Sequence, residues 1–476
     1  MPLPVIRILH PDGDMLRHGV TVIEKQLGLT AEFPEDVQQV AQQAAGQPRL
    51  PRLDRSDLPL VTIDPTGARD LDQALHIARD GDGFVVHYAI ADVAAFVTPG
   101  DPVDQEAHRR GETYYGALSK VPLHPPLLSE GAASLLPDAL RPALLWRIAV
   151  DAEGETSHVH VERALVRSRA QWDYQAVQDA LEAGTADEVF VLLAAVGRLR
   201  LAREAARGGV SLPLPEQEVE RSGDRWQLRF RTPLPVEEWN AQISLLTGMA
   251  AGTLMVEAGV GLLRTLPPPE DRDVERLRRT ARGLGIGWPD GVDYPEFVRS
   301  LDPARPTHAA MLVSCTRLLR GAGYVAFDGA PPDQHGHAAI AAAYAHVTAP
   351  LRRLADRYAG EVCLALCAGE EVPGWVRSAL GSLPATMSAS GQRAGRYEGA
   401  VHDLVEAAVL APRVGESFPA VVVAVEEARP NRGKLVVQDP AVEASVRSAG
   451  PLPLGGRVQA RLVEADVRAR RVRFEV

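Results

Sequence analysis

The chain has 476 residues, of which 46% are hydrophobic and 24% are charged. This balance is that of a soluble globular protein, and the length predicts either two or three domains or one large domain with small satellites. The formal net charge of −11 argues against a protein that coats nucleic acid indiscriminately, because such binding depends on neutralising many phosphates.

Positive charge is unevenly placed along the chain. Residues 413–476 contain ten arginines and one lysine against eight acidic residues, a net charge of +3, which leaves −14 for the rest. An acidic body with a basic tail suits an enzyme that handles a polyanion locally.

The cysteines and the N-terminus indicate the compartment. Cys315, Cys363 and Cys367 form no C-x-x-C pair, so neither a disulfide framework nor a zinc ribbon is expected. The first residues lack the basic-then-apolar layout of a signal peptide, and the longest uncharged stretch, 240–256, is too short to span a bilayer. We therefore expect a cytoplasmic protein without a membrane anchor, and a monomer.

In chain order, the first predicted elements are helices at 15–27 and, after Pro34, at 35–45. A proline-rich loop, 47–60, leads into alternating segments such as 84–90 and 144–150, which predict strands. Helices are then predicted at 173–182, 186–207, 236–258, 270–284, 306–319, 354–368 and 384–410. This order predicts an α+β catalytic body with strands early and helices later.

The C-terminal part of the chain changes pattern to short strands, predicted at 418–425, 434–438, 444–447, 457–464 and 471–476. Five strands in so short a segment resemble an S1-type OB-fold, a common binder of single-stranded nucleic acid. Its aromatic residues are only Phe418 and Phe474, so base stacking is expected to be weak, and Arg429, Arg432 and Lys434 are expected to act on phosphates. The alternative is a small barrel that closes a channel.

Three aspartates, Asp64, Asp70 and Asp72, lie within nine residues of one another. Carboxylates this close raise one another's pKa unless a cation compensates them. Mg²⁺ is the usual ion held by a few carboxylates together with water and substrate phosphates. The alternative is a solvated acidic turn, since Pro65 and Gly67 are ordinary turn residues.

Two distant segments favour the metal site. The runs HYAIADV at 87–93 and HVTAPLRRLAD at 346–356 follow TIDPTGARDLDQ at 62–73 in the same order, and at about the same separations, as three motifs of one known group. Those motifs are T-I-D-x(5)-D-x-D-D, H-I-A-D-V and T-S-P-I-R-R-x-x-D. The chain therefore resembles the RNase II/RNase R family of processive 3′-to-5′ exoribonucleases, over roughly residues 52–410.

This resemblance implies an organisation and an activity. It implies an RNB-type catalytic domain at 51–410 and a C-terminal S1-like OB-fold at 411–476. Family members usually carry two cold-shock barrels before the catalytic domain, which residues 1–50 cannot hold, so a short helical region is expected there, such as a helix-turn-helix. The implied reaction is Mg²⁺-assisted hydrolysis of single-stranded or 3′-overhang RNA to nucleoside 5′-monophosphates, with Mn²⁺ as a substitute ion.

The resemblance also assigns metal-site residues. Asp64 and Asp70 match aspartates that bind the metal or lie next to it, and Asp72 takes the most rate-critical place, between metal and attacking water. The family's fourth aspartate is Gln73 here. A glutamine offers a carbonyl oxygen but no negative charge, so one metal is expected to bind less tightly.

Arg352 matches the first arginine of the T-S-P-I-R-R motif and is expected to contact the scissile phosphate, where a permanently charged fork suits developing charge. The alternative is a surface arginine. Arg353 is expected to make only a flanking phosphate or surface contact.

Glu398 matches a glutamate near the family's active site, with a solvated helix face as the alternative. Tyr115 matches a tyrosine that stacks on nucleotides at the RNA 3′ end, with a buried core tyrosine as the alternative. The family's second aromatic has no counterpart between residues 255 and 272, so the clamp is expected to be one-sided. Asp92 is expected to support the site or cap a turn, and not to bind metal.

Three functions remain open from the sequence. The first is an Mg²⁺-dependent exoribonuclease. The second is an RNA-binding protein that kept the fold but lost catalysis through Gln73 and the missing second aromatic, and the third is a metal-dependent hydrolase of small phosphate esters without a nucleic-acid channel. The retained aspartates and Arg352 favour the first over the second, and the basic C-terminal module favours it over the third.

Overall fold

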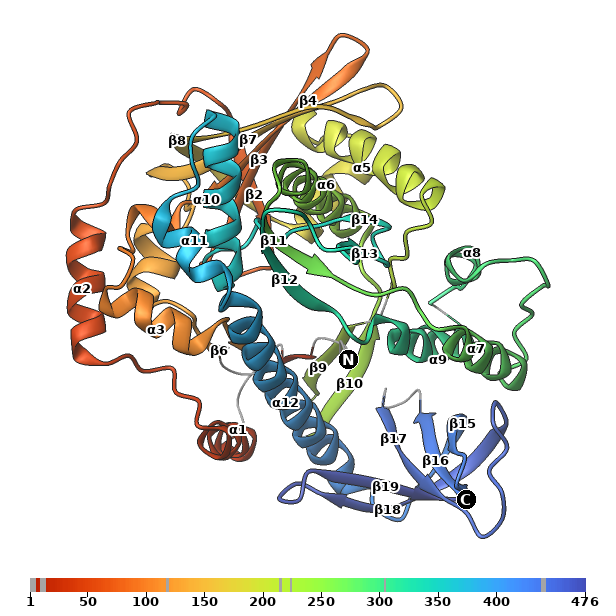
Figure 1. Cartoon of the computed structure of the whole chain (residues 1–476). Coiled ribbons are helices and arrows are strands. Elements are labelled where there is room, and N and C mark those ends of the chain that lie inside the picture. The colour runs from red at the N-terminus through yellow and green to blue at the C-terminus, as the bar shows by residue number, and fades with distance from the viewer. Residues whose placement is uncertain are drawn as a thin grey trace.

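The computed structural model describes residues 6–8, 14–116, 120–213, 216–222, 225–303, 305–437 and 442–476. Two closed five-stranded barrels lie at opposite ends of the molecule, with a group of helices between them (Figure 1). The predicted α+β class, with a C-terminal barrel and a helical N-terminal region, is confirmed.

The first barrel contains, in order around it, β2 (Leu60–Asp64), β3 (Gln73–Asp80), β4 (Gly83–Ala91), β7 (Leu140–Val150) and β8 (Thr156–Asp173). It closes because β2 pairs antiparallel with β3 and parallel with β8. β4 is buried along its whole length, and the buried rings of Tyr88 and Trp146 belong to a core shared with helices. Strands covered on both faces read as nearly continuous apolar runs, which explains the sequence of β4.

The helices that follow this barrel largely match the predicted ones. They are α4 (Tyr174–Glu182), α5 (Glu188–Ala206), α6 (Pro235–Ala258), α7 (Asp271–Gly283), α9 (Pro306–Cys315), α10 (Leu354–Ala368) and α12 (Leu383–Leu410). The described chain also contains helices that the sequence pattern did not predict, α3 (Pro102–Arg110), α8 (Tyr294–Arg299) and α11 (Gly374–Leu380). No described helix has both the length and the apolar character needed to cross a membrane.

Short strands connect these helices. The pairs are β5 (Tyr114–Tyr115) with β6 (Lys120–Val121), β11 (Val260–Thr265) with β12 (Gly323–Asp328), and β13 (Gly336–His337) with β14 (Ala342–Ala343). A further sheet joins β1 (Ile6–Ile8) in parallel to β9 (Glu216–Ser222), which pairs with β10 (Arg225–Arg231). The N-terminal strand thus pairs with a hairpin in the middle of the chain.

Gly248 lets the segment that precedes α10 pack directly on α6. A Cβ atom at this position would lie 2.2 Å from Cε2 of Tyr344 and 2.7 Å from the carbonyl oxygen of Ala345. Only a residue without a side chain allows so close an approach. The segment that leads to Arg352 is therefore held against a long buried helix.

The N-terminal helices α1 (Asp14–Leu27) and α2 (Glu35–Gly46) confirm the two predicted there. They pack on different partners, α1 on α12 and α2 on α3 (Figure 1). A Cβ atom at Gly19 would lie 2.7 Å from a methyl carbon of Leu404, so α1 lies directly on α12. In a helix-turn-helix the two helices pack on each other, so the proposed helix-turn-helix is wrong.

The second barrel contains β15 (Ser417–Glu426), β16 (Arg429–Val437), β17 (Val442–Arg447), β18 (Arg457–Asp466) and β19 (Arg471–Glu475). These are the five predicted strands, although residue 438, the predicted end of the second, lies outside the described residues. The rings of Phe418 and Phe474 meet edge to face at 5.8 Å and are both buried. Neither ring is therefore available to stack on a base.

The second barrel shares its core with α1 and the C-terminal half of α12. Buried residues of all three parts form one apolar cluster, among them Leu16, Val20, Leu404, Val422 and Phe474. The predicted boundary at residue 411 therefore falls within a continuous core.

Candidate active site

The loop between β2 and β3 carries the three aspartates. Asp64 ends β2, and Asp72 directly precedes β3. Ser134 holds the loop in between: its Oγ accepts a hydrogen bond from the N–H of Leu71 (2.9 Å) and donates to the carbonyl oxygen of Arg69 (2.6 Å). The barrel strands therefore fix both ends of the loop, and a buried hydroxyl fixes its middle.

Asp72 is buried, and its partners come from the segment before α10. The N–H of Leu351 donates to Asp72 Oδ1 (2.8 Å), and Nε of Arg352 lies 3.7 Å from Oδ2. Burial raises the pKa of Asp72 to about 8, while the Arg352 charge opposes the rise. Two motifs that lie 279 positions apart thus meet at one carboxylate.

Asp64 lacks a donor at one oxygen. Its Oδ2 is buried and has no hydrogen-bond partner in the described part of the chain. Burial, and next the Asp70 charge, raise the pKa of Asp64 to about 7, against the effect of Arg352. A buried carboxylate without a donor is destabilising, and a bound cation would offset this. Oδ2 of Asp64 therefore fits a metal ion, and so does Oδ2 of Asp72, which at 3.7 Å from Nε of Arg352 is not hydrogen-bonded to it.

Asp70 has a partner at each oxygen. The hydroxyl of Tyr115 donates to Oδ2 (3.2 Å), and Nζ of Lys120 lies 3.0 Å from Oδ1. Lys120 also lies 2.8 Å from Oε1 of Glu130. Lys120 was not predicted from the sequence, in which its one distinction is to be among three lysines in the whole chain.

The side chain of Gln73 contacts protein groups and not the predicted metal position. Its Nε2 donates to the carbonyl oxygen of Thr348 (2.6 Å), and its Oε1 accepts from the hydroxyl of Tyr88 (2.7 Å), which also lies 2.8 Å from Ser244 Oγ. Both ends of the amide are engaged by protein groups. Gln73 therefore bridges the barrel and the Arg352 segment, and this geometry corrects its assignment as a weak metal ligand.

The aspartates do not form a closed three-ligand cage. Among the described residues, the group whose possible ligand atoms all lie within 4.8 Å of one another is a different one, His402, Asp403 and Glu406 on α12. Burial and the charge of nearby Lys434 lower the pKa of His402 to about 4, so that environment already disfavours positive charge. An open arrangement at Asp64 and Asp72 matches Mg²⁺, which takes one or two carboxylates together with water and substrate phosphates.

Tyr115 lies at the mouth of the site. Its side chain is 40% exposed and its hydroxyl reaches Asp70, so the alternative of a buried core tyrosine is wrong. The neighbouring Tyr114 is the buried residue of the pair. Backbone hydrogen bonds tie this strand to the arginine segment, from the N–H of Thr113 to the carbonyl oxygen of Arg352 (2.9 Å).

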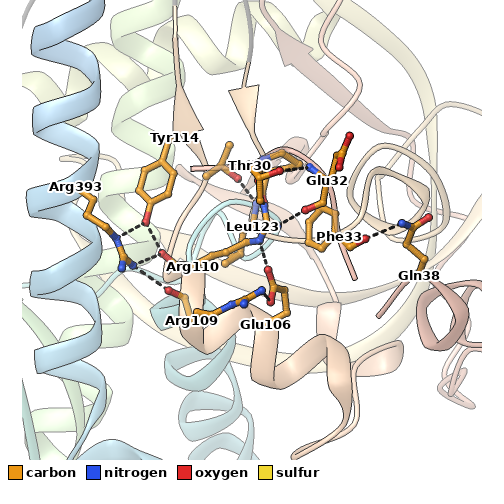
Figure 2. A network of polar contacts seen from close by, with 12 residues as sticks. Thr30, Glu32, Phe33, Gln38, Glu106, Arg109, Arg110, Tyr114, Leu123 and Arg393 are labelled. Atoms are coloured by element: carbon orange, nitrogen blue, oxygen red, sulfur yellow. Dashed lines mark hydrogen bonds and ion pairs between the residues drawn. The ribbon is translucent and has the colours of Figure 1, made fainter. Parts of the chain in front are cut away.

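A polar network behind Tyr114 fixes this strand (Figure 2). The Tyr114 hydroxyl donates to the carbonyl oxygen of Arg110 (2.6 Å) and accepts from Nε of Arg393 on α12 (3.1 Å). The buried Arg110 guanidinium donates to the carbonyl oxygens of Thr30 (2.9 Å) and Glu32 (2.7 Å). The link between α1 and α2 is thereby attached to the element that carries Tyr115.

The two adjacent arginines have different surroundings. The Arg352 side chain is 43% exposed and faces Asp72, so it is open to a ligand. The Arg353 side chain is only 17% exposed and forms two hydrogen bonds of 2.9 Å with Asp356, one to each carboxylate oxygen. Asp356 also accepts the N–H of Ala349 (2.7 Å). The predicted phosphate or surface contact of Arg353 is therefore corrected to a buried ion pair.

Glu398 is exposed on α12, and no hydrogen bond or ion pair joins it to the aspartates in the described chain. Reduced hydration and then the charge of Glu112 raise its pKa. Glu112 was not predicted from the sequence. It pairs with Arg353 through the backbone, and its Oε1 is buried without a hydrogen-bond partner among described residues. The catalytic role of Glu398 stays a prediction.

Aromatic residues do lie near the arginines, although none comes from 255–272. The Tyr324 hydroxyl and Nδ1 of His346 are 2.6 Å apart, and the Tyr344 ring meets the His346 ring edge to face at 5.5 Å. The Arg264 guanidinium covers the Tyr324 ring at 4.8 Å. Burial raises the pKa of Tyr324, and the charge of Arg353 opposes this. The run AYAH before the arginine motif was the available signal.

The remaining predicted residues lie away from the aspartates. In the second barrel, Arg429 pairs with Glu426 (2.9 Å) and Lys434 with Glu443 (2.6 Å), while Arg432 faces Arg447 across β16 and β17. Their RNA-binding role stays a prediction.

Asp92 is buried, and its Oδ2 accepts a hydrogen bond from Nε of Arg163 (2.6 Å). It makes no side-chain cap of the following turn. Asp92 therefore forms an ion pair and the turn-cap alternative is wrong, while its support of the site stays a prediction.

A comparison with protein-family models decides the family. The model of the RNB domain matches residues 52–365, and that of the RNase II-type exonuclease C-terminal S1 domain matches residues 416–476. The chain belongs to the RNB family. The resemblance to the RNase II/RNase R group is confirmed.

Individual RNB proteins show how far the similarity extends. Ribonuclease R of Escherichia coli (strain K12) is 29% identical over 359 residues, which cover 70% of this chain and 41% of that protein. The chain thus spans less than half the length of this curated relative.

Solved structures share the RNB fold over nearly the whole chain. Mycoplasma genitalium RNase R in complex with ribose-methylated single-stranded RNA has a TM-score of 0.85 at 20% identity, covering 97% of this chain and 78% of that one. Yeast Ssd1, a pseudonuclease, has a TM-score of 0.72 at 15% identity, covering 92% of this chain and 56% of that one.

Proposed function

We propose that the chain is a 3′-to-5′ exoribonuclease that hydrolyses RNA processively to nucleoside 5′-monophosphates. One observation carries this proposal: Asp72 and Arg352, from distant motifs, face each other at 3.7 Å next to the exposed Tyr115, which reaches Asp70. Acidic, cationic and aromatic groups at one place are what binding and cleaving a phosphodiester require. Membership of the RNB family and the fold shared with RNase R support the same function.

The chain's own residues account for binding and orientation of the RNA. The Tyr115 ring stacks on the terminal base, and the Arg352 fork binds the scissile phosphate and the charge that develops on it. Asp64 and Asp72 would hold Mg²⁺, which supplies an activated water and neutralises phosphate oxygens when bound. The water oxygen attacks phosphorus, the bond to the 3′ oxygen breaks, and the shortened RNA leaves with a 3′ hydroxyl.

The substrates we propose are single-stranded RNA and duplexes with a 3′ overhang. The second barrel contributes phosphate contacts through Arg429, Arg432 and Lys434. We propose domain limits at 51–410 for the catalytic part and 411–476 for this barrel.

The test is degradation of 5′-labelled RNA, single-stranded or with a 3′-tailed duplex, with Mg²⁺ and with EDTA. We expect stepwise shortening from the 3′ end and nucleoside 5′-monophosphates, only with Mg²⁺, and no product from Asp72→Asn. Unchanged RNA despite tight binding would refute the proposal.

That result would favour the second candidate, an RNA-binding protein without catalysis. Yeast Ssd1, a pseudonuclease, shares the fold, so the RNB fold alone does not distinguish this candidate from the first. Release of phosphate from a small ester, with intact RNA, would instead indicate a phosphate-ester hydrolase.

A further inference from the structure

A lysine side chain lies beside one of the three aspartates. Lys120 on β6 holds Nζ 3.0 Å from Asp70 Oδ1 and 2.8 Å from Glu130 Oε1, and its side chain is 28% exposed. The ammonium group is therefore in contact with two carboxylates, one of which belongs to the aspartate loop.

The groups around Asp70 engage both of its carboxylate oxygens. Lys120 lies on Oδ1 and the Tyr115 hydroxyl on Oδ2, while the amide of Gln73 is engaged at both ends. Asp64 differs, because its buried Oδ2 has no donor among the described residues. Asp72 keeps one such oxygen, Oδ2, because its 3.7 Å separation from Nε of Arg352 is too long for a hydrogen bond. A divalent ion therefore finds an oxygen without a hydrogen bond at Asp64 and at Asp72, whereas both oxygens of Asp70 and both ends of the Gln73 amide have partners.

Hydrolysis of a phosphodiester needs positive charge near the attacking water and near the leaving oxygen, and paired metal ions are one common source of it. We propose that Lys120 takes the place of a second metal ion: its ammonium group neutralises Asp70, and the chain binds one divalent ion, at Asp64 and Asp72. Lys120 acts through Asp70 and is a positioning residue. The role of Lys120 in hydrolysis rests on the proposed function, whereas the predicted number of bound divalent ions does not depend on it.

The test counts Mn²⁺ ions bound to the full-length chain without RNA, by equilibrium dialysis and calorimetry. We expect one ion for the wild type and for Lys120→Arg, which keeps the charge. Lys120→Met uncovers the Asp70 carboxylate and should bind a second ion. The matched control is Lys25→Met, at an exposed lysine on α1, which should bind one ion.

Two further variants test which aspartates bind the ion. Asp70→Asn should keep it with an affinity that falls by no more than about tenfold, whereas Asp64→Asn should weaken it by at least ~100-fold.

Three outcomes would overturn the proposal. These are two Mn²⁺ ions of similar affinity in the wild type, a single ion in Lys120→Met, and loss of the ion in Asp70→Asn. Loss of the ion in Asp70→Asn remains a usable test even if Lys120→Met does not fold. Because the measurement contains no RNA, a chain that binds one ion but leaves RNA intact would overturn the proposed function alone.

Discussion

Replacing the adjacent arginines one at a time should separate catalysis from folding. Arg353→Ala leaves the Asp356 carboxylate, which is 1% exposed, without its charged partner. Removing one member of a buried ion pair typically lowers the free energy of unfolding by ~3–5 kcal/mol, because the other charge stays buried. We therefore expect a clearly lower melting temperature, with cleavage largely retained at temperatures where the variant is folded.

Arg352→Ala should give the opposite result. The side chain is 43% exposed, and its contact with Asp72 at 3.7 Å is too long for a hydrogen bond, so little stability depends on it. Losing one donor aimed at transition-state charge slows a reaction by about 10²–10³-fold. Single-turnover cleavage at saturating enzyme should fall by that factor while the melting temperature stays near the wild-type value.

Differential scanning calorimetry and quenched-flow cleavage of labelled RNA measure the two effects. Arg353→Lys is the matched control: it keeps the charge but loses the two-pronged geometry, so its melting temperature should fall between those of wild type and Arg353→Ala. A stable Arg353→Ala enzyme that has lost cleavage would show that Arg353, and not Arg352, binds the phosphate.

Further variants test the other parts of the site. Asp72→Asn should abolish hydrolysis with RNA affinity nearly unchanged, and a residual rate above about a tenth, ~1.4 kcal/mol of barrier, would contradict its role. Tyr115→Ala should weaken binding of the RNA 3′ end by ~1–3 kcal/mol in a fluorescence titration, whereas Tyr115→Phe should not. Arg429→Ala with Arg432→Ala should reduce the slope of log affinity against log salt by roughly 1.4, at ~0.7 per phosphate contact; an unchanged slope would make the barrel a structural closure.

Without bound metal, the stability of the folded chain should decrease as the pH rises. The pKa values of Asp64 and Asp72 are raised in the folded chain to about 7 and about 8, so the folded state binds more protons than the unfolded state between pH 4 and 8. In EDTA, the melting temperature should therefore decrease as pH rises through this range, and Mg²⁺ should reverse the loss at the high end. A metal-free melting temperature that rises towards pH 8 would contradict these environments.

The sequence was sufficient for the parts of the site that depend on residue type and spacing. Asp64, Asp70, Asp72 and Arg352 occur at fixed intervals within recognisable motifs, so their identities could be read from the sequence. The closure of the barrel could not be predicted, because β2 pairs with both its neighbour β3 and the distant β8. Such pairing depends on contacts far apart in the chain.

The wrong or missing predictions concern the contacts that individual side chains make, and not the types of residue in the motifs. Arg353 was taken for a surface residue, although the spacing to Asp356 is the i, i+3 spacing of an ion pair at a helix start. Nothing local indicated that Gln73 would bridge Tyr88 and Thr348, or that Lys120 would reach Asp70. These partners are chosen by the tertiary structure.

The packing of α1 on α12 has a consequence for folding while the chain is being synthesised on the ribosome. Glu24 of α1 accepts a hydrogen bond from Tyr397 of α12, a residue 373 positions later in the chain. At synthesis rates of about 5–20 residues per second, roughly 20–75 s pass between the synthesis of α1 and that of the part of α12 on which it packs. During that time its apolar residues Leu16, Val20 and Ile23, buried in the finished protein, have no α12 to cover them. Helix α1 is therefore made long before it can pack, and its apolar face needs protection until α12 has been synthesised.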